Sequence, residues 1–312
     1  MKRPQTQITE RPNTASADLD TKPTRDILRI INREDRKVAA AVSRTIPQIS
    51  QAVDLAVAAL TRGGRLVYLG AGTSGRLGVL DAAECIPTFG TNQVVAILAG
   101  APGSMFRPSE MSEDDHRLGV SDLRTIGFGR NDVLVGVSAS GRTPYVLGGL
   151  RYARRLGADT VLLTTNPDAE ARRFARLIIA PLVGPEVIAG STRMKAGTAQ
   201  KLVLNMISTA AMVRLGRVFS NWMIQVELTN AKLRQRGQGI LMRVTGASAS
   251  RARTALKASG YILPVALLML VKGIERREAL ALIEAGPTTA AVVRRALREE
   301  ASARGPGVRQ RR

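Results

Sequence analysis

The stretch LVYLGAGTSGRLGVL at residues 66–80 decides the fold, and VLVGVSASGRTPYVL at residues 133–147 repeats its design. Each begins with five apolar residues, turns through small residues and Ser-Gly-Arg, and continues in a helical pattern. The apolar runs do not alternate with polar residues, which is typical of parallel strands buried on both faces. Superposing Ser74 on Ser140 aligns strand with strand and helix with helix. We therefore expect two strand–turn–helix units in one sheet.

Three further apolar runs of the same kind follow the pattern, at residues 94–98, 160–165 and 177–182. Helical stretches separate the runs, for example at residues 143–156 and 192–216. Strands that alternate with helices predict an α/β fold with a doubly wound parallel sheet.

The chain outside this region predicts helices and little else. We expect an N-terminal arm over 1–22, helices over 23–62, the sheet domain over 63–218, a helical C-terminal unit over 219–300 and a disordered tail over 301–312. Strands are expected to stop near Phe219, and helices to cover about 220–235, 238–245, 248–258, 261–272 and 275–285. Ser248 has the position of an N-cap.

Composition excludes several classes of function. One cysteine, Cys85, and one histidine, His116, exclude a disulfide framework, a cysteine-based zinc site and a His-pair metal motif. No run of about 18 apolar residues occurs, and the N-terminus has no signal-like apolar region, so we expect a cytoplasmic protein and no membrane span. The net charge of +21 is spread widely and aromatic residues are only 3%, which makes a nucleic-acid partner the minority interpretation.

The two Ser-Gly-Arg turns are suited to bind a phosphate group. Glycine lets the backbone come close, helix N-terminal N–H groups point at the anion, and hydroxyl groups add donors. In an open parallel sheet such loops converge at the carboxyl edge of the strands. The predicted phosphate-binding residues are Thr73, Ser74, Gly75, Ser138, Ser140, Gly141 and Thr143.

Two alternatives compete with the phosphate interpretation. Residues 70–75 also fit the dinucleotide pattern G-x-G-x-x-G, but VVAILAGAPG at 94–103 lacks the acidic residue that would take the ribose hydroxyls. The two turns also fit a purely structural role.

Three groups of acidic residues are candidates for acid–base chemistry. Glu84 follows Ser74 by ten residues, about 15 Å along an unbroken helix, so position alone favours an ordinary exposed glutamate. The run from Glu110 through Glu113 to Asp115, with Ser109 and Ser112, resembles ordinary helix capping. Glu186 lies in a Gly/Pro-rich turn and is a further candidate acid or base, which we expect to contact the substrate. Ser191 and Thr192 are expected to begin the long helix and to offer another anion-binding terminus.

Several long motifs resemble one known family. GAGTSGRLGVLDAAEC at 70–85, SASGRTPYVLGGLRYARRLG at 138–157 and GSTRMKAGTAQKLVLNMIS at 190–208 are similar to the N-acetylmuramic acid (MurNAc) 6-phosphate etherases of the sugar isomerase (SIS) superfamily. TERPNTASADLD at 9–20 and RIINREDRKV at 29–38 agree with the same family. The resemblance covers about residues 9–285.

The resemblance implies a fold and a reaction. It implies a five-stranded SIS domain, a homodimer with its active site near the interface, and no metal or cofactor. The implied reaction removes D-lactate from MurNAc 6-phosphate, serving the recycling of cell-wall sugars. The family's catalytic pair falls on Glu84 as the acid and Glu113 as the base, with Glu110 as an alternative to Glu113.

Some features depart from the family or leave other functions open. The segment before Glu110 is unusual, and AGPTTAAVV at 285–293 replaces a usual Gly-Gly-Phe, which puts the last helix in doubt. A non-catalytic SIS regulator needs only the phosphate loops. An aldose–ketose isomerase of the same superfamily would share them and use Glu186.

Overall fold

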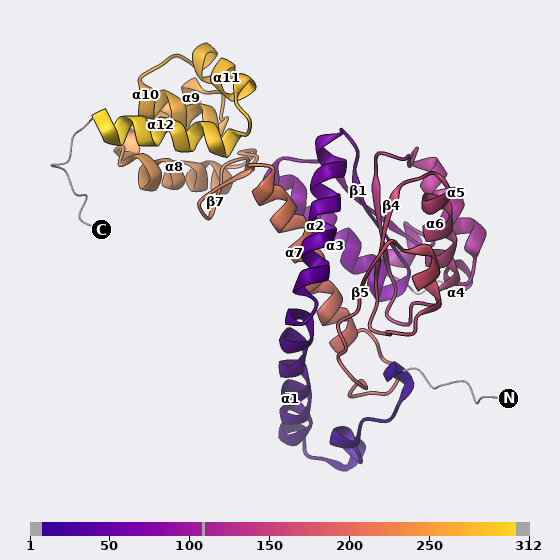
Figure 1. The fold of residues 1–312 in the computed structure, drawn as a ribbon. Coiled ribbons are helices and arrows are strands. Elements are labelled where there is room, and N and C mark those ends of the chain that lie inside the picture. The colour runs from indigo at the N-terminus through magenta and orange to yellow at the C-terminus, as the bar shows by residue number, and fades with distance from the viewer. Residues whose placement is uncertain (1–7, 108–109, 304–312) are drawn as a thin grey trace. The chain divides into compact units, whose positions relative to one another are not determined.

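The computed structural model describes residues 8–107 and 110–303 (Figure 1). The chain divides into two compact units, which are described separately. The first comprises the residues up to Ala83 together with Gln93–Ala211, and the second comprises Glu84–Asn92 and the chain from Met212 onward.

The first unit is built on a five-stranded parallel sheet. Its strands are β1 (Leu66–Gly70), β2 (Val94–Leu98), β3 (Val133–Val137), β4 (Asp159–Leu163) and β5 (Leu177–Ile179), in the order β2-β1-β3-β4-β5. All neighbouring pairs are parallel. The predicted α/β fold is confirmed. Each strand begins at the first residue of the apolar run that predicted it, or one residue before it.

Helices cover both faces of this sheet, as Figure 1 shows. Helix α6 (Pro144–Arg155) packs closely on one face, because a Cβ at Gly149 would lie 2.0 Å from Leu69 Cδ2. Helix α3 (Gly72–Phe89) packs on the other face, where a Cβ at Gly78 would lie 3.0 Å from the Cβ of Tyr68. Since successive strand residues point to opposite faces, these contacts establish the doubly wound arrangement.

The remaining elements of the first unit surround the sheet. Helix α5 (His116–Thr125) packs beside α6, and α2 (Ile46–Thr61) packs on β1, β3 and β5. The other elements are three short 3₁₀ helices (Ile8–Glu10, Thr14–Ser16, Leu19–Thr21), α1 (Thr24–Ser43), 3₁₀ turns at Gly103–Met105 and Glu170–Phe174, α4 (Glu110–Glu113) and α7 (Lys195–Arg214). The N-terminal arm is therefore locally ordered from Ile8 onward.

The second unit begins with a feature that the sequence did not predict. Strands β6 (Val218–Phe219) and β7 (Trp222–Met223) form a small antiparallel hairpin, so the expectation that strands stop near Phe219 is wrong. The helix expected over 220–235 begins only at Ala231, because the Asn230 side chain caps it by accepting a hydrogen bond from the Leu233 N–H.

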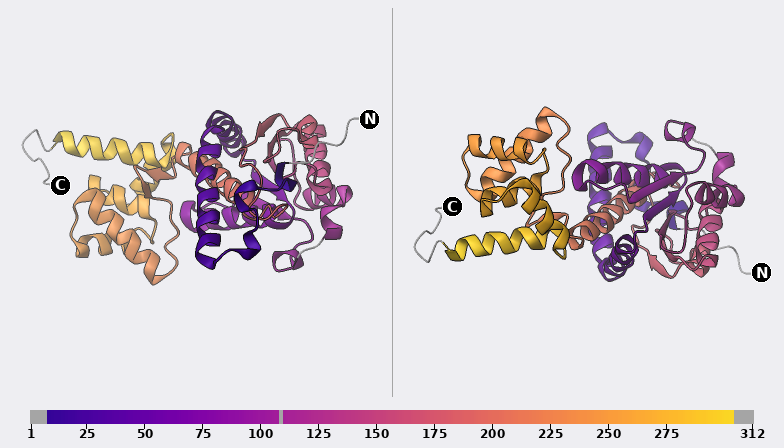
Figure 2. Two further views of the ribbon diagram at one scale, coloured as in Figure 1. Left: turned by 90° about the horizontal axis from the view of Figure 1, so that it is seen from below. Right: turned by 90° about the horizontal axis from the view of Figure 1, so that it is seen from above.

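Five helices complete the second unit. They are α8 (Ala231–Thr245), α9 (Ala249–Ala258), α10 (Leu263–Lys272), α11 (Arg276–Ala285) and α12 (Thr289–Ala303), orange to yellow in Figures 1 and 2. Helix α10 contacts each of the other four and contributes more buried residues to the core than any other of these helices. Ser248 caps α9 as expected. The last helix is present and enters the segment predicted to be disordered, of which residues 304–312 lie outside the described residues.

Within residues 8–107 and 110–303, no single helix is long and apolar enough to cross a membrane. Helices α9 and α10 reach the length and apolar composition of a membrane span only when they are taken together, and the chain bends by 119° between them.

Candidate functional site

The two Ser-Gly-Arg loops lie side by side. Strands β1 and β3 are neighbours in the sheet, and their last residues, Gly70 and Val137, are directly paired. Adjacent strands are about 4.8 Å apart, so the loops that follow them leave the same edge of the sheet at the same level. The structure thus places both predicted phosphate loops at one position.

The first loop requires glycine because strand and helix nearly touch. A Cβ at Gly75 would lie 2.4 Å from the carbonyl oxygen of Gly70, and Gly72 has a left-handed φ of 52°. Thr73 and Ser74 are half-buried in the first turn of α3, where helix N–H groups have no carbonyl partner in their own helix. The Ser74 hydroxyl donates to Gln200 Oε1 on α7 at 3.0 Å.

The second loop gathers three hydroxyl groups. The Oγ atom of Ser138 lies 2.9 Å from Thr143 Oγ1 and 3.4 Å from Ser140 Oγ, and it accepts a hydrogen bond from the Gly141 N–H at 3.0 Å. Gly141 has a φ of 64°, and a Cβ there would lie 2.2 Å from that of Ala169. The close packing holds the loop in one shape, with Ser140 and Thr143 half-buried.

The arginine of the first loop has a structural role. The guanidinium of Arg76 donates to the carbonyl oxygens of Ser104 and Met105, which fixes the 3₁₀ turn after β2. Arg142, its counterpart in the second loop, is exposed. The hydroxyl and backbone N–H groups are therefore the main donors that the loops offer to an anion.

Glu113 contacts the second loop. Thr143 Oγ1 donates to Glu113 Oε1 at 3.3 Å, and the glutamate is half-buried. Glu110 begins the same short helix, α4, and is exposed. This geometry favours Glu113 over Glu110 as the carboxylate that reaches a ligand in the loops.

The capping expected in this acidic run comes from a different residue. The Asp115 side chain accepts from the N–H groups of Arg117 and Leu118 and caps α5. Ser112 lies inside α4, and Ser109 lies outside the described residues.

Glu84 is exposed and distant from the loops along its own helix. Helix α3 runs from Gly72 to Phe89 and contains Pro87 near its end. Because the helix continues through Glu84, that residue stands about 15 Å along the axis from Ser74. The helix does not fold Glu84 back onto the loop that begins it.

Glu186 caps a helix. It is fully buried, and its two carboxylate oxygens accept the N–H groups of Lys195 and Ala196 at 3.0 and 2.9 Å. Burial raises the pKa of Glu186, although these two N–H groups act to lower it. Helix α7 begins at Lys195 rather than at Ser191, and Glu186 already occupies the terminus that was expected to be open to an anion.

A buried ion pair stands next to this cap. Lys195 Nζ lies 2.7 Å from Glu34 Oε2, and both side chains are only 1% exposed. Burial alone would raise the pKa of Glu34, but hydrogen bonds from Lys195, Lys37 and Asn13 outweigh it and lower the pKa to about 2. Sequence reasoning missed this pair, although MKAG at 194–197 and REDR at 33–36 both lie in motifs of the family resemblance.

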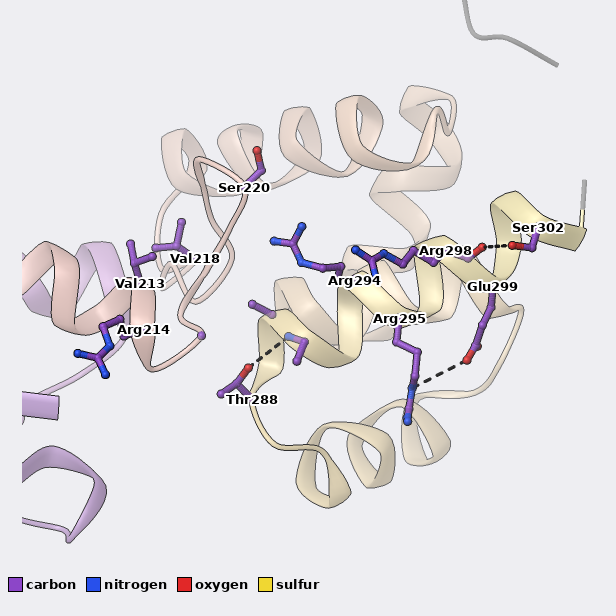
Figure 3. A pocket seen from close by; sticks show the side chains of 13 residues that line it. Val213, Arg214, Val218, Ser220, Thr288, Arg294, Arg295, Arg298, Glu299 and Ser302 are labelled. Atoms are coloured by element: carbon purple, nitrogen blue, oxygen red, sulfur yellow. Dashed lines mark hydrogen bonds and ion pairs between the residues drawn. The ribbon is translucent and has the colours of Figure 1, made fainter. Parts of the chain in front are cut away.

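The second unit contains a cavity that none of the predicted site residues lines. It has a volume of about 920 Å³ and lies between the β6–β7 hairpin and α12 (Figure 3). Arg294, Arg295 and Arg298 of α12 line it, and Arg294 stacks on Phe219. As for metals, no group of three or more His, Cys, Asp or Glu side chains capable of holding an ion occurs in the part of the chain that the structure describes.

Comparison with known proteins agrees with the fold. Residues 48–154 match the model of the glucokinase regulatory protein N-terminal SIS domain, and residues 127–210 match that of the SIS domain. A putative phosphosugar isomerase from Bacteroides fragilis, involved in capsule formation, is similar in structure with a TM-score of 0.50. It is 20% identical, and the match covers 64% of this chain and 97% of that chain.

Much closer relatives exist among proteins of assigned activity. N-acetylmuramic acid 6-phosphate etherase 1 of Vibrio cholerae is 50% identical over 87% of this chain and 91% of its own. The corresponding etherase of Edwardsiella ictaluri is 52% identical over 89% of this chain and 93% of its own. Identity of this level across nearly the full length of both chains means that this protein belongs to the N-acetylmuramic acid 6-phosphate etherase family.

Proposed function

We propose that this protein is a carbon–oxygen lyase that removes D-lactate from the C3 ether of MurNAc 6-phosphate and leaves N-acetylglucosamine (GlcNAc) 6-phosphate. The observation that carries this proposal is about 50% identity to etherases along almost the whole chain. The reaction belongs to the recycling of amino sugars from the cell wall.

The paired loops supply the binding site for the sugar phosphate in this proposal. The two loops leave the same edge of the sheet, because they follow adjacent parallel strands. Their hydroxyl groups and helix N-terminal N–H groups therefore lie close together. A phosphate dianion accepts hydrogen bonds only, so a set of donors around glycine-rich turns is complementary to it. The loops fix the sugar at C6 and leave C2 and C3 to other groups.

Glu113 serves as the base at C2. An unactivated ether is a poor target for direct hydrolysis, but in the open-chain sugar the C2 proton is adjacent to the C1 aldehyde and can be removed. The contact between Thr143 and Glu113 supports this role, because it joins the carboxylate to the phosphate-binding loop. A positioned carboxylate acting as base typically contributes a factor of about 10² to 10⁴ in rate.

Glu84 serves as the acid for the departing lactate. Loss of the C2 proton expels lactate from C3 and leaves a C2–C3 double bond conjugated with the aldehyde; Glu84 protonates the leaving oxygen, and water then adds at C3. Glu84 lies about 15 Å along α3 from Ser74, so we infer that a second subunit presents it in a homodimer. The expected cytoplasmic location and the expected absence of a cofactor belong to this proposal too.

Two other functions need different chemistry from the same fold. An aldose–ketose isomerase would need Glu186 as its base, but both carboxylate oxygens of that residue are engaged in capping α7. A non-catalytic regulator would need only the loops and gives no reason for Glu113 to contact Thr143. These observations favour the lyase.

One experiment tests both the activity and its route. The purified protein is incubated with MurNAc 6-phosphate in ¹⁸O-labelled water, and mass spectrometry follows lactate and sugar. Elimination followed by addition gives unlabelled lactate and one ¹⁸O at C3 of GlcNAc 6-phosphate. Absence of lactate release would contradict the etherase activity, and label in the lactate would contradict the elimination route while leaving the activity intact.

A further inference from the structure

Within the first unit, residues 73–81 of α3 and 197–208 of α7 lie in contact, and the two helices run in the same direction there. Near their starts, a Cβ at Gly197 would lie 3.4 Å from the side chain of Thr73. Further along, Asp81 accepts hydrogen bonds from Asn205 and Ser208. The side chain of Gln200, one turn after Gly197, therefore meets the phosphate loop from a helix that the sequence motif of that loop does not include.

Gln200 is buried and incompletely satisfied. It is 1% exposed, its Oε1 accepts the hydrogen bond of the Ser74 hydroxyl at 3.0 Å, and its Nε2 has no hydrogen-bond partner within the described residues. Buried amide donors are nearly always paired, so an unpaired one indicates a function or a second state.

The arrangement also sets the direction of the Ser74 hydroxyl. A serine has one proton to donate, and here it is directed to Gln200. Phosphate oxygens accept hydrogen bonds and cannot donate to the lone pairs that remain. In this state Ser74 cannot be the phosphate donor that the loop requires.

We infer that Gln200 is a positioning residue for the substrate phosphate. This inference rests on the proposed function and concerns the same site. When phosphate binds, the Gln200 amide turns over, Nε2 donates to Ser74 Oγ, and the Ser74 proton is released to the phosphate. The amide has nearly the same shape in both orientations, so no repacking is needed. The exchange replaces an unpaired buried donor with an unpaired acceptor, and it adds a charge-assisted hydrogen bond, which is stronger than a neutral one.

The first test replaces Gln200 with a residue whose side chain cannot donate a hydrogen bond at neutral pH. In Gln200→Glu at neutral pH, the carboxylate retains the Ser74 proton and adds negative charge beside the phosphate. We expect KM for MurNAc 6-phosphate to rise about tenfold or more, while kcat for lactate release stays within about twofold. KM should fall again as the pH is lowered and the carboxyl group becomes a donor. Gln48→Leu, on α2, is the control and should leave KM unchanged.

The second test asks whether Gln200 acts through Ser74. Gln200→Leu keeps the site apolar and should raise KM in the wild-type background, yet add less than about a factor of two in a Ser74→Ala background. If Gln200→Leu raised KM by the same factor in the wild-type and Ser74→Ala backgrounds, the inference would be overturned. The same holds for an unchanged KM in both Gln200 variants, or for equal losses of kcat and melting temperature without a change in KM.

A readout that does not depend on turnover separates this inference from the proposed function. Calorimetric binding of GlcNAc 6-phosphate should weaken in the Gln200 variants in parallel with KM. If the wild-type protein releases no lactate, the etherase proposal fails, and this binding measurement alone decides the role of Gln200.

Discussion

Replacing Lys195 with methionine should destabilise the first unit more than any exposed charge substitution. The ammonium group of Lys195 lies 2.7 Å from Glu34, and both side chains are 1% exposed. Methionine fills a similar volume but carries no charge, so Glu34 would retain its own charge in the interior with fewer partners. Removing one member of a buried pair typically costs about 3–5 kcal/mol.

The pKa of Glu34 indicates how strongly the folded protein stabilises its charge. The pKa of Glu34 is lowered from 4.5 to about 2 by hydrogen bonds that outweigh its burial, and the first of these comes from Lys195. Each pKa unit corresponds to about 1.4 kcal/mol, so the three donors together favour the charged carboxylate by about 3 kcal/mol, and removing Lys195 takes away the first of their contributions. For a unit of this size, each kcal/mol lost lowers the melting temperature by roughly 2–4 °C.

The assay is scanning calorimetry at pH 7 on the wild type, Lys195→Met and the control Lys272→Met. Lys272 pairs with Glu299 at 2.6 Å, but the two side chains are 32% and 52% exposed, so solvent screens the pair and its removal should change the melting temperature little. Combining Lys195→Met with Glu34→Gln should recover part of the loss, because the uncompensated charge is then gone. If Lys195→Met changes the melting temperature no more than Lys272→Met does, the reasoning is refuted.

Three further predictions follow from the site and its surroundings. Glu113→Gln should slow exchange of the substrate's C2 proton with deuterium by about 10²-fold or more while Glu110→Gln leaves it intact, and the reverse result would move the base by one helical turn. Gly141→Ala should destabilise the fold by about 2 kcal/mol or more in denaturant titrations, because the φ of Gly141 is 64° and a Cβ there would lie 2.2 Å from the methyl group of Ala169. Gly129→Ala is the neutral control, because the space around Gly129 is open. Glu34 has a lowered folded pKa, so its contribution to stability is complete above about pH 4.5 and is lost as the pH falls toward 2; unfolding curves of Glu34→Gln should lack this part of the acid dependence.

The sheet was predictable because its signal is local and redundant. All five strands coincide with mostly apolar runs, and β1 and β3 are buried at every residue. The turn after each of these two strands carries glycines that the geometry requires. The β6–β7 hairpin was missed because its strands have two residues each, too short for any periodicity. The start of α8 could have been predicted from Asn230, because asparagine is a favoured N-cap residue. The helix predicted over 220–235 instead placed Asn230 in its interior.

In the candidate site, too, the features that are local in sequence were predictable and the contacts between distant residues were not. The loops around Ser74 and Ser140 were located from sequence because strand, turn and helix are contiguous there. The contact between Thr143 and Glu113 joins residues 30 positions apart, and that between Ser74 and Gln200 joins residues 126 positions apart. The capping role of Glu186 was not visible in the sequence, because the helix that it caps begins nine residues later, at Lys195.

The position of Glu84 leads to a last prediction about which subunit supplies the acid. In the substrate only the carbons C4, C5 and C6 separate the phosphoester oxygen from C3, a chain much shorter than the roughly 15 Å that ten helical residues span. If Glu84 serves the partner's site in a two-fold dimer, a heterodimer of Glu84→Gln and Glu113→Gln subunits contains one site with both carboxyl groups intact. Mixing the two inactive variants under conditions of subunit exchange should then restore about a quarter of the wild-type lactate release, since random pairing makes half of the dimers mixed. If the acid comes from the same subunit as the base, every site in the mixture lacks one group and no activity returns.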